Sequence, residues 1–239
     1  MSKIAERLTI VQDNIAAACA RIGRNPEKVQ MVVVTKTASM EDIQEVVRLG
    51  CTHLGENRAQ HLKQVAEDLD AYLATHKDEP GIPQKVHWHM IGHLQRNKAK
   101  LVLKVASLIH SVDTLRLAEE LNSLSVKQDL RTDVLLQINC SDEPQKSGAP
   151  VGAAVHLAEQ IGTMPNLRLV GLMTMAPLTL NKDLVRSCFV RARELFEEIR
   201  GEKIAGNKFR HLSMGMSQDY ELAIEYGATI LRIGSAIFS

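Results

Sequence analysis

The chain has 239 residues, 45% of them hydrophobic and 24% charged, which is typical of a globular protein that buries a sizeable core. Its 29 Lys and Arg residues against 28 Asp and Glu residues give a net charge of +1, which argues against a nucleic-acid or anionic-membrane partner. Four scattered cysteines without a CxxC pair, a charged N-terminal segment unlike a signal peptide, and no apolar run near the ~20 residues of a membrane span favour a cytoplasmic protein.

Helical and strand patterns alternate along the chain. Apolar residues at steps of three and four predict a first helix over residues 4–22, and Pro26 follows its end. Short apolar runs predict strands over residues 31–35, 53–55, 86–91, 108–112, 133–139, 167–173, 211–212 and 229–233. Helical periodicity lies between them, over residues 40–49, 57–69, 95–105, 114–126, 151–162, 182–200 and 218–226. Ser39 is a predicted N-cap, and the Pro- and Gly-containing segment 75–85 is a predicted loop.

Eight strands separated by seven helices, with one more helix in front, predict an α/β fold with a parallel sheet. Eight strands in about 240 residues match a single (β/α)8 TIM-type barrel, and we expect residues 1–239 to form one domain. The N-terminal helix would take the place of the helix missing after the eighth strand. An open, doubly wound sheet is the alternative, although strand one is not followed by a glycine-rich nucleotide-binding turn.

Lys36 ends the first predicted strand, directly after an apolar run. Burial at such a position would lower the pKa of the amine from about 10.4 and make it nucleophilic. A nucleophilic lysine can form a Schiff base with an aldehyde such as pyridoxal phosphate. The alternative is that Lys36 turns outward and pairs with a carboxylate.

Small polar residues follow the last two strands, where barrel enzymes often bind phosphate. Ser213, Gly215, Gly234 and Ser235 would allow close backbone approach and supply hydroxyl donors, although helix caps use the same residue types. Arg232 alternates with Ile230 on the eighth strand, so an inward-facing Arg232 would be buried and would need a partner. That partner is either a carboxylate such as Glu56 or the ring nitrogen of a pyridine.

His87 and His89 form an HxH pair on one face of a predicted strand, which is a zinc arrangement known in barrels. No acidic ligand clearly completes the set, so core or supporting histidines are favoured and we predict no metal site. The lysines of the mixed run 98–104 are most simply a solvated helix face.

Eight motifs in order along nearly the whole chain resemble the pyridoxal phosphate homeostasis protein family. They are VVVTK at 32–36, LGENRAQ at 54–60, WHMIGHLQRNK at 88–98, HSVDT at 110–114, KSG at 146–148, GLMTMAP at 171–177, LSMGMSQD at 212–219 and RIGSAIF at 232–238. The resemblance implies a barrel similar to the N-terminal domain of alanine racemase. The chain ends at Ser239, where family members usually carry a glycine and continue, which affects the rim after strand eight.

The same resemblance implies roles for individual residues. Lys36 would hold pyridoxal phosphate as a Schiff base, and Arg232 would lie near the ring nitrogen. The phosphate cradle would comprise Ser213, Gly234 and Ser235, with Met214 and Gly215 in the same loop. Asn57 would lie close to the cofactor.

Two classes of function remain in view. A carrier would hold pyridoxal phosphate for intracellular homeostasis and could deliver it to pyridoxal phosphate-dependent apo-enzymes. The alternative is an amino-acid racemase, which would need a tyrosine as a second base. Tyr72, Tyr220 and Tyr226 all fall on predicted helices or their ends, so we expect a carrier without that base rather than an enzyme. In the absence of heptads or an apolar exposed stripe, we expect a monomer.

Overall fold

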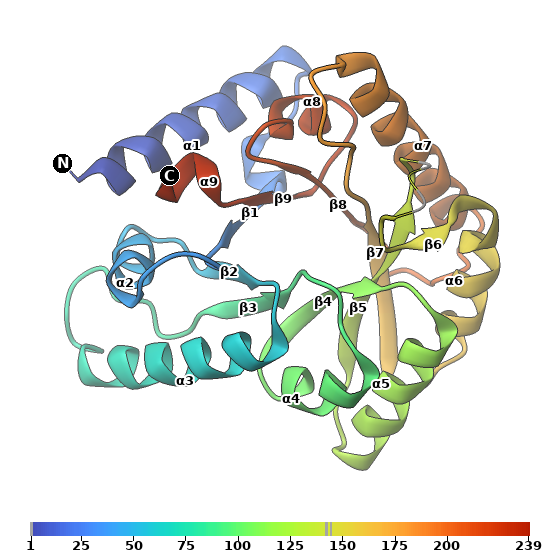
Figure 1. Cartoon of the computed structure of the whole chain (residues 1–239), viewed down its shortest axis with the longest axis horizontal. Coiled ribbons are helices and arrows are strands. Elements are labelled where there is room, and N and C mark those ends of the chain that lie inside the picture. Colours follow the sequence, from blue (N-terminus) through green and yellow to red (C-terminus); the bar gives the residue numbers. More distant parts are fainter. Residues whose placement is uncertain (1, 142, 144) are drawn as a thin grey trace.

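The computed structural model describes residues 2–141, 143 and 145–239. Within them, eight parallel strands close into a barrel with helices around its outside, which confirms the predicted fold class (Figure 1). Around the barrel the strands are β1 (Gln30–Val34), β2 (His53–Glu56), β3 (His87–Met90), β4 (Ala106–Val112), β5 (Thr132–Asn139), β7 (Leu167–Met173), β8 (His211–Met216) and β9 (Ile230–Ile233), which pairs with β1 again. A two-residue strand, β6 (Ala149–Pro150), pairs with the end of β5.

The helices follow the predicted alternation closely. They are α1 (Lys3–Arg21), α2 (Met40–Arg48), α3 (Ala59–Thr75), α4 (Ala99–Leu103), α5 (Leu115–Lys127), α6 (Ala154–Gly162), α7 (Lys182–Gly201), α8 (Tyr220–Glu225) and α9 (Ser235–Phe238). Short 3-10 turns lie at Pro26–Lys28, Arg96–Lys98 and Val151–Ala153. Ser39 caps α2 as predicted: its side chain accepts from the Asp42 N–H, and the Asp42 carboxylate accepts from the Ser39 N–H.

Helix α1 completes the outer ring of helices. It packs against α8 and α9 on one side and α2 on the other (Figure 1). Its apolar face is buried at Ile4, Leu8, Val11, Ile15 and Cys19. It covers the barrel beside α9, the four-residue helix that follows the last strand. The prediction that the N-terminal helix takes this place is therefore confirmed.

The strands bury side chains on both faces, as a barrel requires. The outward face packs against the helices in the larger core. The inward face forms a small apolar cluster of Val32, Leu108, Leu135, Val170, Met173 and Ile230. The rest of the buried interior includes polar side chains, among them His89, His110, Ser213 and Arg232. These polar residues make the barrel interior the place to look for function.

Several elements differ from the sequence prediction. Strand β8 continues to Met216, although Ser213–Ser217 was expected to be a loop, because serine and glycine are poor indicators of a strand. Helix α3 begins two residues later than expected and continues to Thr75. Strand β6 and helix α9 are too short to give a periodic signal. In the described part of the chain, we find no helix that is long and apolar enough to cross a bilayer.

Candidate functional site

The carboxyl ends of β1 and β9 lie side by side and place Lys36 and Arg232 at the same end of the barrel. In the pairing of the two strands, Val32 lies opposite Arg232 and Val33 opposite Ile233. Lys36 follows the end of β1 by two residues, and Arg232 is the third residue of β9. Two cationic side chains from distant parts of the sequence therefore belong to neighbouring strands.

Lys36 is exposed, whereas Thr35 before it is fully buried. The expected burial of the Lys36 amine is therefore wrong, because the chain turns at the mouth directly after Thr35. This turn is fixed by a backbone hydrogen bond of 2.9 Å from Ala38 N to Thr35 O. Among the described residues, no carboxylate lies within ion-pair distance of the Lys36 amine, so the alternative of a structural ion pair is not supported either. The amine is open to a ligand at the mouth.

Arg232 is buried inside the barrel with 4% of its surface exposed, on the same strand face as Ile230. Its Nη1 donates to Ser213 Oγ at 2.6 Å, and its Nη2 donates to the carbonyl oxygen of Thr174 at 2.9 Å. Burial lowers the pKa of the guanidinium to about 10, and the nearby Asp219 opposes that shift. Arg232 is therefore still charged at neutral pH.

The expected alternative of an ion pair between Arg232 and Glu56 is wrong. Glu56 is fully buried at the end of β2, and its carboxylate accepts from the Thr35 hydroxyl. The second carboxylate oxygen lies 2.9 Å from Nδ1 of His61 on α3. Glu56 thus ties the end of β1 to β2 and α3, directly before Lys36, and leaves Arg232 with neutral hydrogen-bond partners.

The residues expected to cradle phosphate divide into two groups. The hydroxyl of Ser213 lies inside the barrel, within hydrogen-bond distance of Arg232 and His110. Met214 is fully buried in the outer core, between the strands and the helices. Gly215 is packed against α8, where an added Cβ would lie 2.6 Å from the Cβ of Ala223. These three residues belong to β8. The Ser213 hydroxyl was expected at the mouth, but it points into the barrel instead.

Gly234 and Ser235 lie at the mouth, where the loops after β8 and β9 meet as predicted. The hydroxyl that joins these loops belongs to Ser217, which the sequence reading did not select. Ser217 Oγ accepts from the N–H groups of Gly234 at 3.3 Å and Ala236 at 3.1 Å. Backbone donors are thus gathered at this junction. The signal available in the sequence was that Ser217 directly precedes the helix predicted over residues 218–226.

Asn57 lies half-buried directly after β2. Its backbone is tightly packed against the loop after β3, since a Cβ on Gly92 would lie 2.2 Å from the Asn57 carbonyl oxygen. Gly92 is therefore required for the close approach of the two loops. The structure places Asn57 at the same barrel end as Lys36.

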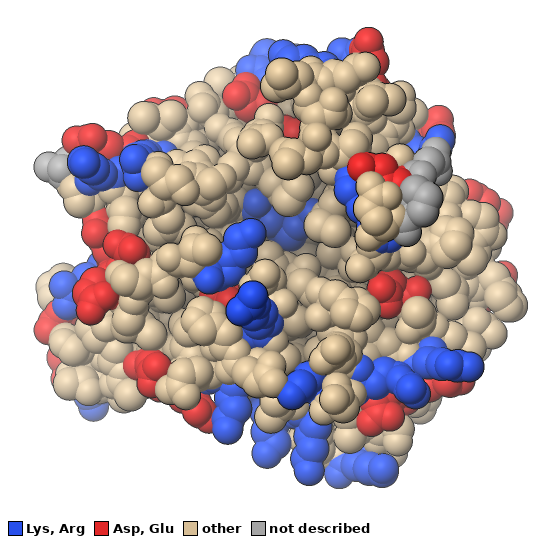
Figure 2. All heavy atoms as spheres, viewed as in Figure 1, with Lys and Arg blue, Asp and Glu red and all other residues tan. Residues whose placement is uncertain are grey.

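Further charged groups surround this mouth. His93, after β3, lies 3.7 Å from Asp113, after β4. In the loop after β5, Lys146 Nζ pairs with Glu143 and donates to the carbonyl oxygen of Ala176 at 3.0 Å. In the space-filling view, the centre of the face above the barrel is hollowed, and Lys and Arg side chains lie in and beside the hollow (Figure 2). An anionic ligand suits such a mouth.

The histidines of the HxH pair lie inside the barrel and at its amino-terminal end. His89 is buried, and His87 stacks on His53 with ring centroids 4.9 Å apart. Among the residues the structure describes, no group of three His, Cys, Asp or Glu side chains is arranged to hold a metal ion. All four cysteines, Cys19, Cys51, Cys140 and Cys188, are buried, as predicted.

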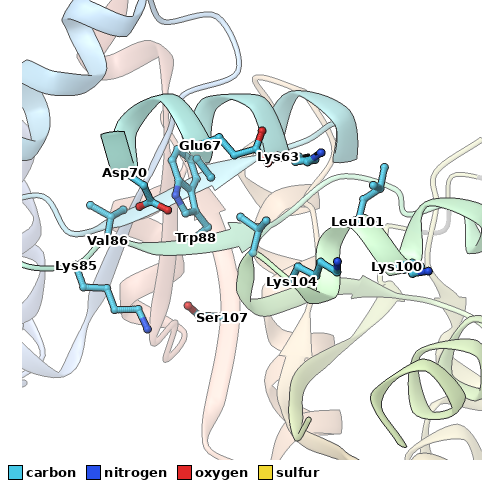
Figure 3. A pocket seen from close by; sticks show the side chains of 12 residues that line it. Lys63, Glu67, Asp70, Lys85, Val86, Trp88, Lys100, Leu101, Lys104 and Ser107 are labelled. Atoms are coloured by element: carbon cyan, nitrogen blue, oxygen red, sulfur yellow. Dashed lines mark ion pairs between the residues drawn. The ribbon is translucent and has the colours of Figure 1, made fainter. Parts of the chain in front are cut away.

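A separate groove of about 650 Å³ lies on the outside of the barrel, between α3 and α4 (Figure 3). Its walls include Lys63, Lys85, Lys100 and Lys104, with Glu67 and Asp70 among them. Lys63 pairs with Glu67 at 3.5 Å, which is typical of a solvated helix surface. The groove contains none of the predicted site residues.

Comparison with known proteins identifies the class to which this barrel belongs. Residues 7–239 match the family described as alanine racemase, N-terminal domain. The chain is 38% identical to the pyridoxal phosphate homeostasis protein of Escherichia coli strain K12, over 100% of this chain and 97% of that protein. It is 37% identical to the protein of the same name from Aquifex aeolicus, over 98% of this chain and 96% of that one.

A solved structure agrees with this assignment. PipY of Synechococcus elongatus, determined with PLP bound, superposes with a TM-score of 0.78 at 30% identity, over 99% of this chain and 100% of that chain. The chain therefore belongs to the pyridoxal phosphate homeostasis protein family, as its motifs indicated.

Proposed function

We propose that this protein binds pyridoxal 5′-phosphate at the carboxyl end of the barrel and serves in intracellular pyridoxal phosphate homeostasis. Lys36 would hold the cofactor as a Schiff base, which keeps the reactive aldehyde out of solution. The observation that carries the proposal is the juxtaposition of Lys36 and Arg232 on neighbouring strands, in a family whose relative PipY was determined with PLP bound.

The residues present fit this cofactor. Lys36 is an open amine at the mouth, and Arg232 is a charged donor fixed inside the barrel on the neighbouring strand. The N–H groups of Gly234 and Ala236 converge on Ser217 Oγ where two loops meet, and a phosphate oxygen would suit the same donors, with the Ser235 hydroxyl beside them. Asn57 would contact the cofactor from the β2 side. The roles expected of Met214 and Gly215 become structural ones, since both pack away from the mouth.

The arrangement favours a carrier over the alternative, an amino-acid racemase. A racemase needs a base on each face of the cofactor ring, and the tyrosines are placed elsewhere. Tyr72 lies on α3, Tyr220 begins α8, and Tyr226 directly follows the end of α8. The Tyr220 hydroxyl accepts from Asn14 of α1, on the outside of the barrel. We propose a single-domain, monomeric cytoplasmic holder that can pass cofactor to apo-enzymes.

Replacing Lys36 tests the assignment. Lys36→Ala should abolish the visible absorption of protein incubated with pyridoxal phosphate, because it removes the amine that would form the Schiff base. Lys3→Ala, at the exposed start of α1, is the matched control and should keep the wild-type spectrum. An unchanged spectrum in Lys36→Ala after removal of free cofactor would disprove the role of Lys36.

A second assay distinguishes a carrier from a racemase. Loaded protein incubated with L-alanine should form D-alanine no faster than free pyridoxal phosphate does, while an added apo-enzyme should gain activity. Rapid D-alanine formation that disappears in Lys36→Ala would favour the racemase.

A further inference from the structure

A continuous file of hydrogen-bonded polar side chains runs through the barrel, from Arg232 toward the opposite end. Ser213 Oγ lies 2.6 Å from Arg232 Nη1 and 3.0 Å from His110 Nδ1. His110 Nε2 lies 2.9 Å from His89 Nδ1, and His89 Nε2 lies 3.0 Å from His53 Nδ1. We refer to Arg232, Ser213, His110, His89 and His53 as the interior file. It links the proposed cofactor site to the amino-terminal end of the barrel.

The file crosses the interior from strand to strand. Arg232 is on β9, Ser213 on β8, His110 on β4, His89 on β3 and His53 on β2. The four residues from Arg232 to His89 are buried, and His53 is half-buried at the start of its strand. Sequence periodicity does not reveal this file, because contacts across a barrel connect strands that are distant in the chain.

The donors and acceptors available in the interior file fix the direction of its hydrogen bonds from Arg232 to His89. The Arg232 N–H must donate, so Ser213 Oγ accepts from it. Ser213 can then place its own proton on His110 Nδ1, which leaves His110 Nε2–H to donate to His89 Nδ1. Beyond that bond, the side-chain amide of Gln30 lies 3.0 Å from His53 Nδ1 and 3.4 Å from His89 Nε2 and shares the contact between the two rings. The reverse order would leave the buried Ser213 proton without an acceptor among the described residues, and an unsatisfied buried donor is costly.

The direction matters because Arg232 is a buried cation whose direct partners are neutral. A serine that donates onward is a better acceptor, since hydrogen bonds in a chain polarise one another. His89 and His110 serve this purpose as neutral rings: burial lowers the pKa of His89 to about 3 and that of His110 well below its ordinary value. Protonated rings would place like charges beside the guanidinium.

We propose that His110, acting through Ser213, is a positioning residue that fixes the Arg232 guanidinium under the cofactor ring. This role rests on the proposed function, because the ring nitrogen of pyridoxal phosphate is the group that Arg232 would meet. It assigns Ser213 to the ring side of the site and not to the phosphate.

Ser213→Ala separates these two roles. Affinities for pyridoxal phosphate and for pyridoxal, which lacks the phosphate, are measured for each variant by spectral titration. Ser213→Ala should weaken both by a similar factor, about tenfold, because the lost acceptor acts through Arg232. Ser111→Ala is the matched control: Ser111 is also fully buried on a barrel strand, but its hydroxyl has no partner among the described residues. That control should change either affinity by less than about twofold.

A double-mutant cycle tests the route through Arg232. His110→Phe, which keeps a ring but removes both hydrogen bonds, should shift the absorption maximum of bound pyridoxal phosphate in the wild-type background. In an Arg232→Ala background it should produce no further shift, because the effect passes through the arginine. Ser213→Thr, which retains the hydroxyl, should restore the wild-type spectrum relative to Ser213→Ala.

The outcomes are distinct. Loss of affinity for pyridoxal phosphate but not for pyridoxal in Ser213→Ala would overturn the inference and leave cofactor binding intact. Wild-type protein that takes up no pyridoxal phosphate would overturn the proposed function, and the positioning role with it. A measurement without cofactor applies even if the variants fail to fold: nitrogen NMR of the wild-type histidines should find His110 neutral, with its proton on Nε2. A proton on Nδ1 would overturn the proposed direction.

Discussion

Arg232 illustrates how a charged residue can be held inside a barrel. It is 4% exposed, and its hydrogen bonds go to a serine hydroxyl and a backbone carbonyl. A buried charge normally needs a partner of opposite charge or several oriented dipoles. Here the dipoles are provided by Ser213 and Thr174, with Asp219 contributing at longer range. The guanidinium is therefore free to interact with a ligand on its remaining side.

The buried histidines predict a pH-dependent stability. Burial lowers the pKa of His89 from 6.5 to about 3, so the unfolded chain binds a proton below pH 6.5 that the folded chain excludes. Stability is therefore fully present above pH 6.5 and is lost as the pH falls toward 3. Linkage gives a loss of about 2 kcal/mol at pH 5 for one such histidine, and His110 acts in the same direction.

Urea unfolding at pH 7.5 and pH 5.0 measures this difference in the free energy of unfolding. His89→Gln, which cannot be protonated in either state, should show a smaller loss between the two pH values than wild type. Equal free energies of unfolding for wild-type protein at both pH values would contradict the account.

At the scale of the element, β8 decides how the site is built. Its backbone carries Ser213 to the interior and Met214 to the outer core, as the alternation of a strand requires. Gly215 follows with a φ of +94° and lies against α8. The strand can therefore end close to α8 and leave Ser217 to join the loop after β9.

Gly215→Ala should destabilise the protein by about 2–4 kcal/mol, because the added Cβ meets Ala223 at a backbone conformation that favours glycine. Gly201→Ala is the control, since a Cβ at Gly201, the last residue of α7, meets nothing within 4 Å. That control should lie within about 1 kcal/mol of wild type. Thermal or urea unfolding checks both, and equal stabilities for the two variants would argue against the close packing of β8 on α8.

The same strand shows what could be predicted from the sequence. The boundaries of β1, β5, β7 and α7 followed from their apolar periodicity and lie within a residue or two of the prediction. The extent of β8 did not follow from periodicity. The buried Ser213 hydroxyl is satisfied by hydrogen bonds to Arg232 and His110, which are distant from it in the sequence. Local hydrophobicity does not predict hydrogen-bond partners that are distant in the sequence.

The position of the binding site at the mouth was predictable in outline from the barrel topology. Lys36, Gly234 and Ser235 were placed correctly at the carboxyl ends of strands because barrel topology determines that end. The exposure of Lys36 and the junction role of Ser217 depend on how two loops turn, and neither turn has a periodic pattern.

At the scale of the whole molecule, α1 closes the ring of helices between α8 and α2. Leu8 is 3% exposed in this contact, whereas Ile10 on the same helix is 58% exposed. Leu8→Ala should therefore cost about 2–5 kcal/mol of stability, and Ile10→Ala should remain within about 0.5 kcal/mol of wild type. Similar losses for both variants in urea unfolding would show that α1 does not pack as described.

The central claim is that Lys36 carries pyridoxal phosphate at the mouth of this barrel. The most direct test is to load purified protein with pyridoxal phosphate, reduce it with borohydride and map the modified peptide by mass spectrometry. The account predicts one pyridoxyl-phosphate group on the peptide that contains Lys36. Protein that remains unmodified, or a label spread over surface lysines without preference for Lys36, would contradict it.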